Sequence, residues 1–361
     1  MKTSEECLSY IQDRLYYPKT GLLYDCIIEN ETVLPTAEEI AADIPNANGC
    51  STVMEDCMIT GGTLLHGLCA QMERTDGSGS GFAAQIADGM LKSAAQGKDG
   101  YIPRGVHPSD GKLHYRDCSR DQITMCLYGL LRYASSGFCS GEMKERIAAL
   151  AKRTADRAIR NVIPENDCNL LTEDGKPSLN GRFWGEKCGT HEIFRLPQIY
   201  LTAYVLTGEE RYYTHYLSVR DEALERSHPV EDCWAMYCFQ QMAVSLDTAR
   251  RFDRDPRIRE VCGAILDEIA DYAGQKLPVI RNHIAEAPET AFSVRGYYVP
   301  FYYIQDAAIV PMLEALAPHR GVSPAWEALC RETLEKLPYS GKTALPVHFF
   351  TALELMRQYH K

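Results

Sequence analysis

Two aspartates lie at points where a polar stretch of the chain runs into an apolar one. Asp56 stands in MEDCMITGG and Asp121 in SRDQITMCLYGLL, and each is followed by a long run without Asp, Glu, Lys or Arg. A carboxyl group held between a polar loop and the dry start of a buried helix is well placed for proton transfer. We therefore hypothesise that Asp56 and Asp121 form a catalytic pair.

Helix capping is the alternative explanation for both residues. Asp is favoured at the N-cap and in the first turn of a helix, where it accepts backbone hydrogen bonds and meets the positive end of the helix dipole. A helix N-terminus lowers the pKa of a carboxyl group in general, whereas a general acid needs a raised pKa. The catalytic hypothesis therefore requires burial or a second carboxylate, such as that of Asp56 beside Asp121, to outweigh the dipole.

The elements that must position these residues are helices, because strand signals are scarce and helical periodicity dominates. We count twelve helical segments along the chain, and the odd-numbered ones are amphipathic. In the fifth, residues 141–162, Ile147, Leu150 and Val162 recur at helical spacing. The even-numbered segments are apolar or small on almost every side, which is typical of buried helices. The twelve predicted segments are residues 4–16, 56–73, 79–96, 121–134, 141–162, 191–207, 209–226, 231–249, 256–275, 304–317, 323–336 and 346–359.

This alternation predicts an all-α fold in which an inner ring of helices is wrapped by an outer ring, the (α/α)6 toroid. Connections from odd to even helices are mostly long, as at residues 97–120 and 163–190, and the others are short. In an array of antiparallel hairpins the long loops therefore gather at one end, with the starts of the inner helices. Loops of this length are usually functional, although they would also serve simply to cap the ring. We expect residues 1–361 to form a single catalytic domain.

The long loops and the inner-helix starts supply side chains suited to sugar binding. Aromatic rings pack against sugar faces, and Arg binds carboxylates through two parallel hydrogen bonds. Packing at the rim of the ring is an equally good explanation for much of the aromatic content. The expected substrate-binding residues are Arg104, His107, Arg120, Gln122, Trp184, His191, Glu192, Arg295 and Tyr298.

Composition argues against several classes of protein. The chain of 361 residues has a formal net charge of -11 and no cluster of Lys or Arg, so nucleic-acid binding is not expected. Its runs without Asp, Glu, Lys or Arg fall short of the ~18 residues of a membrane helix, and the N-terminus lacks the apolar core of a signal peptide. The 14 Cys include no C-x-x-C pair, which predicts reduced thiols in the cytoplasm.

Neither a metal nor another cofactor is expected. His107, His114 and Cys118 fit no standard zinc spacing. The sequence GSGSG at residues 77–81 has no strand before it and no Lys after it, so it does not match a phosphate-binding loop, and no G-x-S-x-G elbow is present. The expected partner is an oligosaccharide substrate, and the sequence does not indicate an oligomeric state.

The chain resembles the six-hairpin glycosidase superfamily, and within it the unsaturated glucuronyl hydrolases and unsaturated rhamnogalacturonyl hydrolases. The likeness of architecture covers nearly the whole chain, whereas the likeness of motifs rests on MEDCMITGG and SRDQITMCLYGLL. The resemblance implies that Asp121 is the general acid and base and that Asp56 supports it or shares its charge state. The run GRFWGEKCGTHEIFRLPQIY matches the corresponding family segment only loosely, which affects the substrate more than the fold.

We therefore expect a glycoside hydrolase that acts on short oligosaccharides, including ones that end in an unsaturated uronic acid. Asp121 would donate a proton to the sugar and then activate water, and hydration of an unsaturated sugar is a variant of the usual two-carboxylate scheme. Two alternatives stay open. One is a polysaccharide lyase or sugar epimerase that uses His107, His191 or Tyr298 as its base, and the other is a non-catalytic carbohydrate-binding protein.

Overall fold

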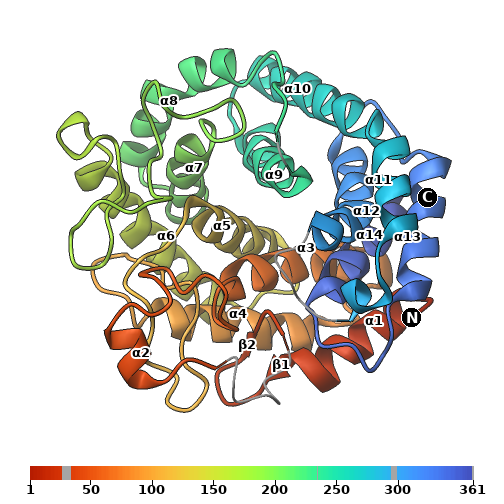
Figure 1. Cartoon of the computed structure of the whole chain (residues 1–361). Helices are drawn as coiled ribbons and strands as arrows, with labels where there is room; N and C mark the ends of the chain where they lie inside the picture. Colours follow the sequence, from red (N-terminus) through yellow and green to blue (C-terminus); the bar gives the residue numbers. More distant parts are fainter. Residues whose placement is uncertain (27–33, 234, 294–298, 360–361) are drawn as a thin grey trace.

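The computed structural model describes residues 1–26, 34–233, 235–293 and 299–359 (Figure 1). Helices dominate these residues, and the one sheet among them is the antiparallel pair of β1 (Tyr16–Tyr17) and β2 (Leu22–Leu23). The predicted all-α class is therefore confirmed. The α-helices are α1 (Ser4–Tyr10), α2 (Ala37–Ala41), α3 (Cys57–Thr75), α4 (Ser80–Ala94), α5 (Arg120–Ser135), α6 (Gly141–Asn161), α7 (Arg195–Thr207), α8 (Glu210–Arg226), α9 (Met236–Phe252), α10 (Pro256–Gly274), α11 (Leu277–Glu286), α12 (Val299–Leu316), α13 (Pro324–Lys336) and α14 (Leu345–Tyr359).

Six of these helices contact one another in the order of the chain, and the last of them contacts the first. Helix α3 packs on α5, α5 on α7, α7 on α9, α9 on α12, α12 on α14, and α14 on α3. Helices α4, α6, α8, α10 and α13 each pack on at least one of the six from outside, and α1 packs on α14 (Figure 1). Each of the six inner helices is therefore covered by two neighbours of its own group and by outer helices.

Burial follows the two sequence patterns. In α5 every residue from Gln122 to Ala134 is buried, whereas α6 buries one face that includes Ile147, Leu150 and Ala158. The charged positions between these, such as Lys144, are exposed. No helix in the described parts of the chain combines the length and the apolar character that a bilayer crossing requires.

Several helix boundaries differ from the prediction. Helix α7 starts at Arg195 instead of residue 191, because residues 191–194 form turns, one of them closed by the bond from the Arg195 N–H to the Glu192 carbonyl at 3.3 Å. Helix α9 starts at Met236 instead of residue 231, after an extended Ala235. Helix α12 begins at Val299, before the predicted residue 304.

Two short helices were not predicted, and the first predicted helix is shorter. Helix α2 is opened by a capping box in which Thr36 and Glu39 bond each other's backbone, a T-x-x-E signal that is present in the sequence. Helix α11 follows α10 almost directly. The helix predicted over residues 4–16 ends at Tyr10 and continues as a π-helical turn, Ile11–Leu15.

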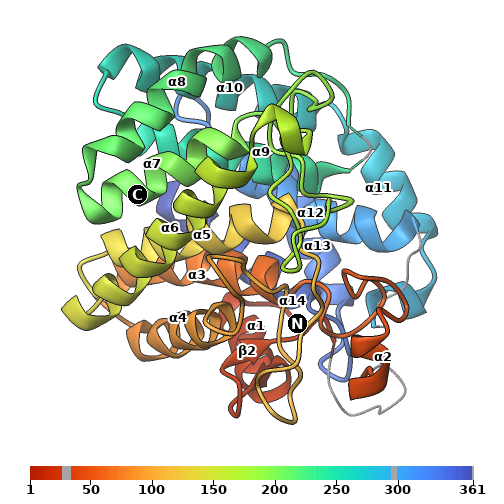
Figure 2. The ribbon, with the colours of Figure 1, turned by 90° about the vertical axis from the view of Figure 1, so that its left-hand side faces the viewer.

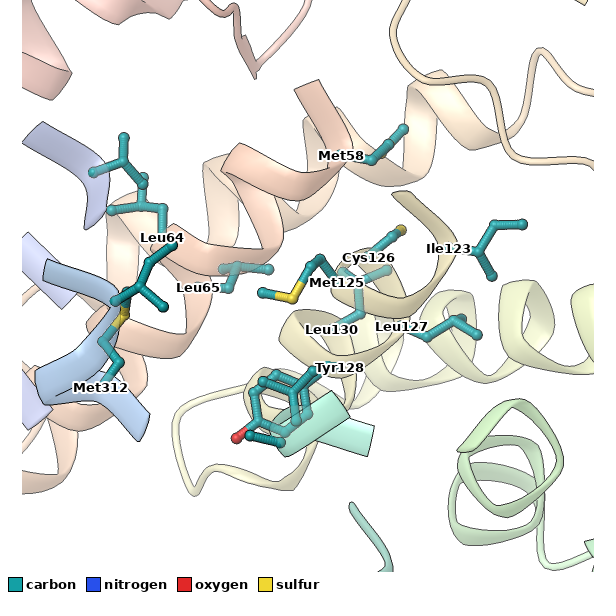
Figure 3. Packing of buried hydrophobic residues seen from close by; sticks show 14 of the residues in the cluster. Met58, Leu64, Leu65, Ile123, Met125, Cys126, Leu127, Tyr128, Leu130 and Met312 are labelled. Atoms are coloured by element: carbon teal, nitrogen blue, oxygen red, sulfur yellow. The ribbon is translucent and has the colours of Figure 1, made fainter. Parts of the chain in front are cut away.

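Two glycines set the distance between α3 and α5. A Cβ on Gly62 would lie 2.1 Å from the carbonyl oxygen of Met125, and a Cβ on Gly129 would lie 2.6 Å from the Cα of Gly62. The two helix backbones therefore touch at this point. Buried side chains of both helices pack around the contact with Met312 of α12, and Figure 3 labels Met58, Leu64, Leu65, Ile123, Met125, Cys126, Leu127, Tyr128 and Leu130 among them.

A buried polar network joins α3, α5 and α9. The Tyr128 hydroxyl donates a hydrogen bond to the Asp247 carboxylate at 2.9 Å and lies 3.3 Å from Nε2 of His66. Arg251 donates to the same carboxylate at 2.6 Å. Burial lowers the pKa of His66 to about 3, so its imidazole is neutral at physiological pH. This network satisfies polar groups in an otherwise apolar interior.

The longer connections gather at one end of the molecule. Helix α2, the coil between α6 and α7, and helix α11 all lie toward the right-hand side of Figure 2. The coil between α6 and α7 includes a short 3-10 turn, Pro164–Asn166, and is tied back by an isolated bridge between Asn169 and Arg182.

We predict that Gly62→Ala lowers the free energy of unfolding by about 3 kcal/mol, because the added methyl group overlaps the Met125 carbonyl and forces α3 and α5 apart. Urea denaturation measures the change. Gly81→Ala is the matched control, since a Cβ there meets no atom within 4 Å and alanine is the better helix former. Unchanged stability of Gly62→Ala would contradict the close contact.

Candidate active site

A cavity of about 200 Å³ lies where several inner helices begin. Both Asp56, the N-cap residue of α3, and Asp121, in the first turn of α5, line it. Of the other inner helices, α9, α12 and α14 contribute residues near their N-terminal ends, α7 contributes none, and the loops add coil residues. The lining residues used below are Asp25, Glu55, Arg104, Asn180, Tyr237, Gln240, Gln241, Phe301, Tyr302, Gln305 and His348.

The carboxylate of Asp56 does not cap its own helix. No side-chain capping hydrogen bond forms at this position, and the Asp56 N–H instead donates to both carboxylate oxygens of Asp25, at 3.0 and 3.1 Å. The Asp56 Oδ1 accepts a hydrogen bond from Gln122 at 2.7 Å and lies 3.8 Å from the Arg104 guanidinium. The capping explanation therefore does not account for Asp56.

Gln122 connects the starts of α3 and α5. Its side chain is fully buried, and its amide nitrogen donates to Asp56 and, at 2.9 Å, to the carbonyl of Glu55. Its amide oxygen accepts from the Ile59 N–H at 3.1 Å. One side chain thus satisfies backbone groups in the first turn of α3 and fixes the Asp56 carboxylate.

Asp121 is oriented by an ion pair. Its Oδ1 accepts a hydrogen bond from Arg195, the first residue of α7, whose side chain is only 2% exposed. Arg195 also donates through Nε to the His191 carbonyl at 3.3 Å. Ser119, the N-cap residue of α5, makes no side-chain capping bond, and Asp121 is 27% exposed toward the cavity side of the helix start. Helix α7 thereby contributes to the site by holding Asp121.

Three buried polar atoms of the cavity wall have no hydrogen-bond partner among the described residues. They are Nε of Arg104, Oε1 of Gln241 and Nδ1 of His348. Each side chain is more than nine-tenths buried. Leaving such groups unpaired costs free energy, and each of the three atoms has almost no accessible surface of its own.

The protonation of two wall residues follows from burial. Burial lowers the pKa of His348 to about 4, so the imidazole is neutral, and its Nε2 accepts from the Gln305 amide at 2.8 Å. The hydrogen of this neutral ring is then on Nδ1, the atom without a partner. Burial, with Cys238 and Asp121 nearby, raises the pKa of Tyr237, so its phenol stays protonated.

The cavity wall is acidic and partly aromatic. Four carboxyl groups line it, those of Asp25, Glu55, Asp56 and Asp121, and Arg104 is the lining residue with a permanent positive charge among those described. Burial opposes that charge, but neighbouring Cys118 and Asp56 raise the pKa of Arg104, so it stays cationic. The rings of Tyr237, Phe301 and Tyr302 supply flat apolar surface, with Tyr237 and Tyr302 centred 6.1 Å apart.

Of the predicted substrate-binding residues, Arg104 lines the cavity and Gln122 lies directly behind it. Arg104 donates to the Glu55 carbonyl at 3.2 Å, which holds its head group at the start of α3. Arg120 and Glu192 lie outside the cavity lining and form an ion pair with each other. They join the start of α5 to the turn before α7 instead of facing a ligand.

His107, Trp184 and His191 also lie outside the cavity lining. The Nδ1 of His107 pairs with the Ser109 hydroxyl of its own loop at 2.6 Å, and Nε2 pairs with the carbonyl of Pro35, before α2, at 2.9 Å. The Trp184 ring packs under the Arg226 guanidinium. These contacts, and not the cavity, therefore account for His107 and Trp184.

Arg295 and Tyr298, the two remaining predicted residues, lie outside the described residues. Several lining residues were not predicted, among them Asp25, Asn180, Gln241 and His348. A signal was available for Gln241, because polar amides inside an apolar helix need a reason to be there. Asp25 and Asn180 come from loops whose path the sequence does not fix.

One further group of side chains is able to hold a metal ion. The ring nitrogen of His191 and the sulfurs of Cys233 and Cys238 lie within 4.8 Å of one another. Hydrogen bonds from Cys238 and His191 lower the pKa of the Cys233 thiol, against the effect of burial. This group was not predicted, because His191 is remote in the chain and the two Cys are not spaced as C-x-x-C.

Comparison of the chain with protein-family models, with curated proteins and with solved structures found no match.

We predict that Gln122→Met lowers the free energy of unfolding by about 2 kcal/mol, because the Ile59 N–H loses its buried acceptor and the Glu55 carbonyl keeps only the bond from Arg104. The sharper readout is hydrogen exchange, where the Ile59 amide should exchange faster. Gln198→Met is the matched control: Gln198 is equally buried and bonds Thr124 and Ser245, away from α3. An Ile59 amide that stays as protected as in the parent would contradict this role of Gln122.

Proposed function

We propose that the fold is an (α/α)6 toroid and that the chain is a glycoside hydrolase acting on short oligosaccharides. The contacts of α3, α5, α7, α9, α12 and α14 in sequence, with the other long helices outside them, support the toroid. One observation carries the enzymatic proposal. Two aspartates from different helices line one cavity, the Asp56 carboxylate makes no capping bond to α3, and the Asp121 carboxylate is paired with Arg195 of α7.

In this proposal Asp121 is the general acid and base. It donates a proton to the sugar and then activates a water molecule, while Asp56 supports it as the second carboxylate. Arg195 keeps the Asp121 carboxyl group oriented through both steps, and Gln122 does the same for Asp56. Such fixed positioning is what general acid–base catalysis requires.

The cavity wall suits a sugar. Hydroxyl groups of a sugar both donate and accept, so they suit a wall lined by carboxyl groups, side-chain amides and Arg104. The rings of Tyr237 and Tyr302 offer apolar surface to a sugar face. A uronic carboxylate would have to approach Arg104 against four acidic neighbours, so neutral sugars and unsaturated uronides must be compared directly.

The alternatives use other residues. A lyase or an epimerase was expected to use His107, His191 or Tyr298, of which the first two lie outside the cavity lining and the third lies outside the described residues. We keep the hydrolase as the proposal for this reason. A cytoplasmic location is part of the same proposal, since all 14 cysteines are unpaired thiols.

We predict that Asp121→Asn lowers kcat by at least ~100-fold on the saccharide that the parent hydrolyses, because the amide has no proton to exchange with the sugar. The substrates to screen are unsaturated disaccharides and aryl glycosides of neutral sugars. Loss of ultraviolet absorbance reports consumption of an unsaturated sugar, whereas a gain would reveal a lyase. Activity that stays within tenfold of the parent would remove Asp121 from the mechanism.

The matched control for that substitution is Asp117→Asn. Asp117 is buried in the loop just before α5 but does not line the cavity, so its variant should keep activity within a fewfold of the parent.

A binding measurement with the Asp56→Asn/Asp121→Asn double variant tests the alternative that the chain is a non-catalytic carbohydrate-binding protein. Retained binding, with no turnover by the parent on any substrate screened, would identify a carbohydrate-binding protein.

A further inference from the structure

We propose that His191, Cys233 and Cys238 form a binding site for a soft divalent metal ion, of which Zn²⁺ is the best match. This site is separate from the proposed glycosidase cavity, since none of the three residues lines it. The inference therefore stands or fails independently of the proposed activity.

The three side chains come from different segments that the fold brings together. His191 lies in the turn before α7, Cys233 in the coil before α9, and Cys238 in the first turn of α9. Their ligating atoms already lie within 4.8 Å of one another. In a tetrahedral zinc site with Zn–S bonds of about 2.3 Å and Zn–N bonds of about 2.0 Å, ligand atoms are roughly 3.5–3.8 Å apart. Binding thus requires movements of about 1 Å, well within the reach of side-chain rotation.

The donor set decides which metal fits. Two sulfurs and an imidazole nitrogen are the ligands that Zn²⁺ and other soft or borderline ions prefer, whereas Mg²⁺ and Ca²⁺ require oxygen ligands. Two thiolates would neutralise the charge of Zn²⁺ and leave the imidazole neutral. A net charge of zero is compatible with a site in which Cys238 is buried.

The site is also accessible and has an open position. The His191 side chain is 26% exposed, which gives an ion a path from solvent. Among the described residues the group has three ligands, His191, Cys233 and Cys238. Water would therefore take the fourth position of a tetrahedral ion. Structural zinc sites usually have four protein ligands, and three ligands with an open position are the pattern of exchangeable or reactive zinc.

A bound ion would connect two segments that border the cavity. Cys238 directly follows the lining residue Tyr237, and the His191 carbonyl accepts a hydrogen bond from Arg195, the partner of Asp121. A metal ion that binds the folded chain more tightly than the unfolded chain stabilises the folded state. Folding is what brings His191 to the two Cys, since His191 is remote from them along the chain. The ion would therefore join the start of α9 to the turn before α7.

The test uses the full chain, treated with a chelator under reducing conditions and then titrated with Zn²⁺. We expect one Zn²⁺ per chain with submicromolar affinity, a higher thermal midpoint, and no such effect of Mg²⁺. Co²⁺ used as a probe should give the thiolate-to-metal absorption band of a sulfur-ligated ion. Cys233→Ser/Cys238→Ser and His191→Asn should each weaken Zn²⁺ binding by at least ~100-fold.

Cys168→Ser is the matched control, because Cys168 is half-buried in a loop like Cys233 but belongs to no such group. Circular dichroism confirms that each variant is folded before its affinity is compared. Zn²⁺ binding that survives in the double Cys variant would overturn the proposal, as would a reduced parent that binds no Zn²⁺. A Cys233–Cys238 disulfide that persists in thiol reductant and excludes the metal would also overturn it.

Discussion

The direct contact of the α3 and α5 backbones is the constraint on which the candidate site depends. At Gly62 and Gly129 the two helices lie too close for any side chain to intervene. This proximity puts the start of α3 within reach of Gln122, whose amide then bonds Ile59, Glu55 and Asp56. If the helices were separated by one more layer of side chains, Asp56 and Asp121 would not share a cavity wall.

The two acids at the site are held by other parts of the chain. Gln122 of α5 donates to the Asp56 carboxylate, and Arg195 of α7 pairs with Asp121, so each acid is held by a residue from a different helix. The Asp56 carboxylate makes no capping bond to α3, and the Asp121 carboxylate is bonded by Arg195 of α7. Three side chains of the cavity wall, those of Arg104, Gln241 and His348, carry a buried polar atom without a partner among the described residues. Deeper in the interior, the Asp247 network pairs its polar groups with one another.

The helical class and the two acids were within reach of sequence analysis, because both depend on local patterns. Uncharged runs after Asp56 and Asp121 mark buried helices, and buried helices begin where the chain enters the core. The loop residues of the cavity were harder to predict, since the hydrogen-bond partners of a His or an Arg in a loop depend on how that loop packs. His107 bonds the Pro35 carbonyl of another loop, and Arg120 pairs with Glu192. Asp25 lies at the site although it belongs to a distant segment of the chain. The His191–Cys233–Cys238 group depends on the packing of α7 against α9, which no spacing in the sequence encodes.

The central claim is that Asp56 and Asp121 act on one bound sugar. A crystal structure of the Asp121→Asn variant, soaked with the intact saccharide that the parent hydrolyses, tests it most directly. The account predicts a sugar in the cavity whose reacting bond lies between the side chains at positions 56 and 121, within hydrogen-bond reach of both. A sugar bound elsewhere on the molecule, or one in the cavity that contacts neither side chain, would contradict it.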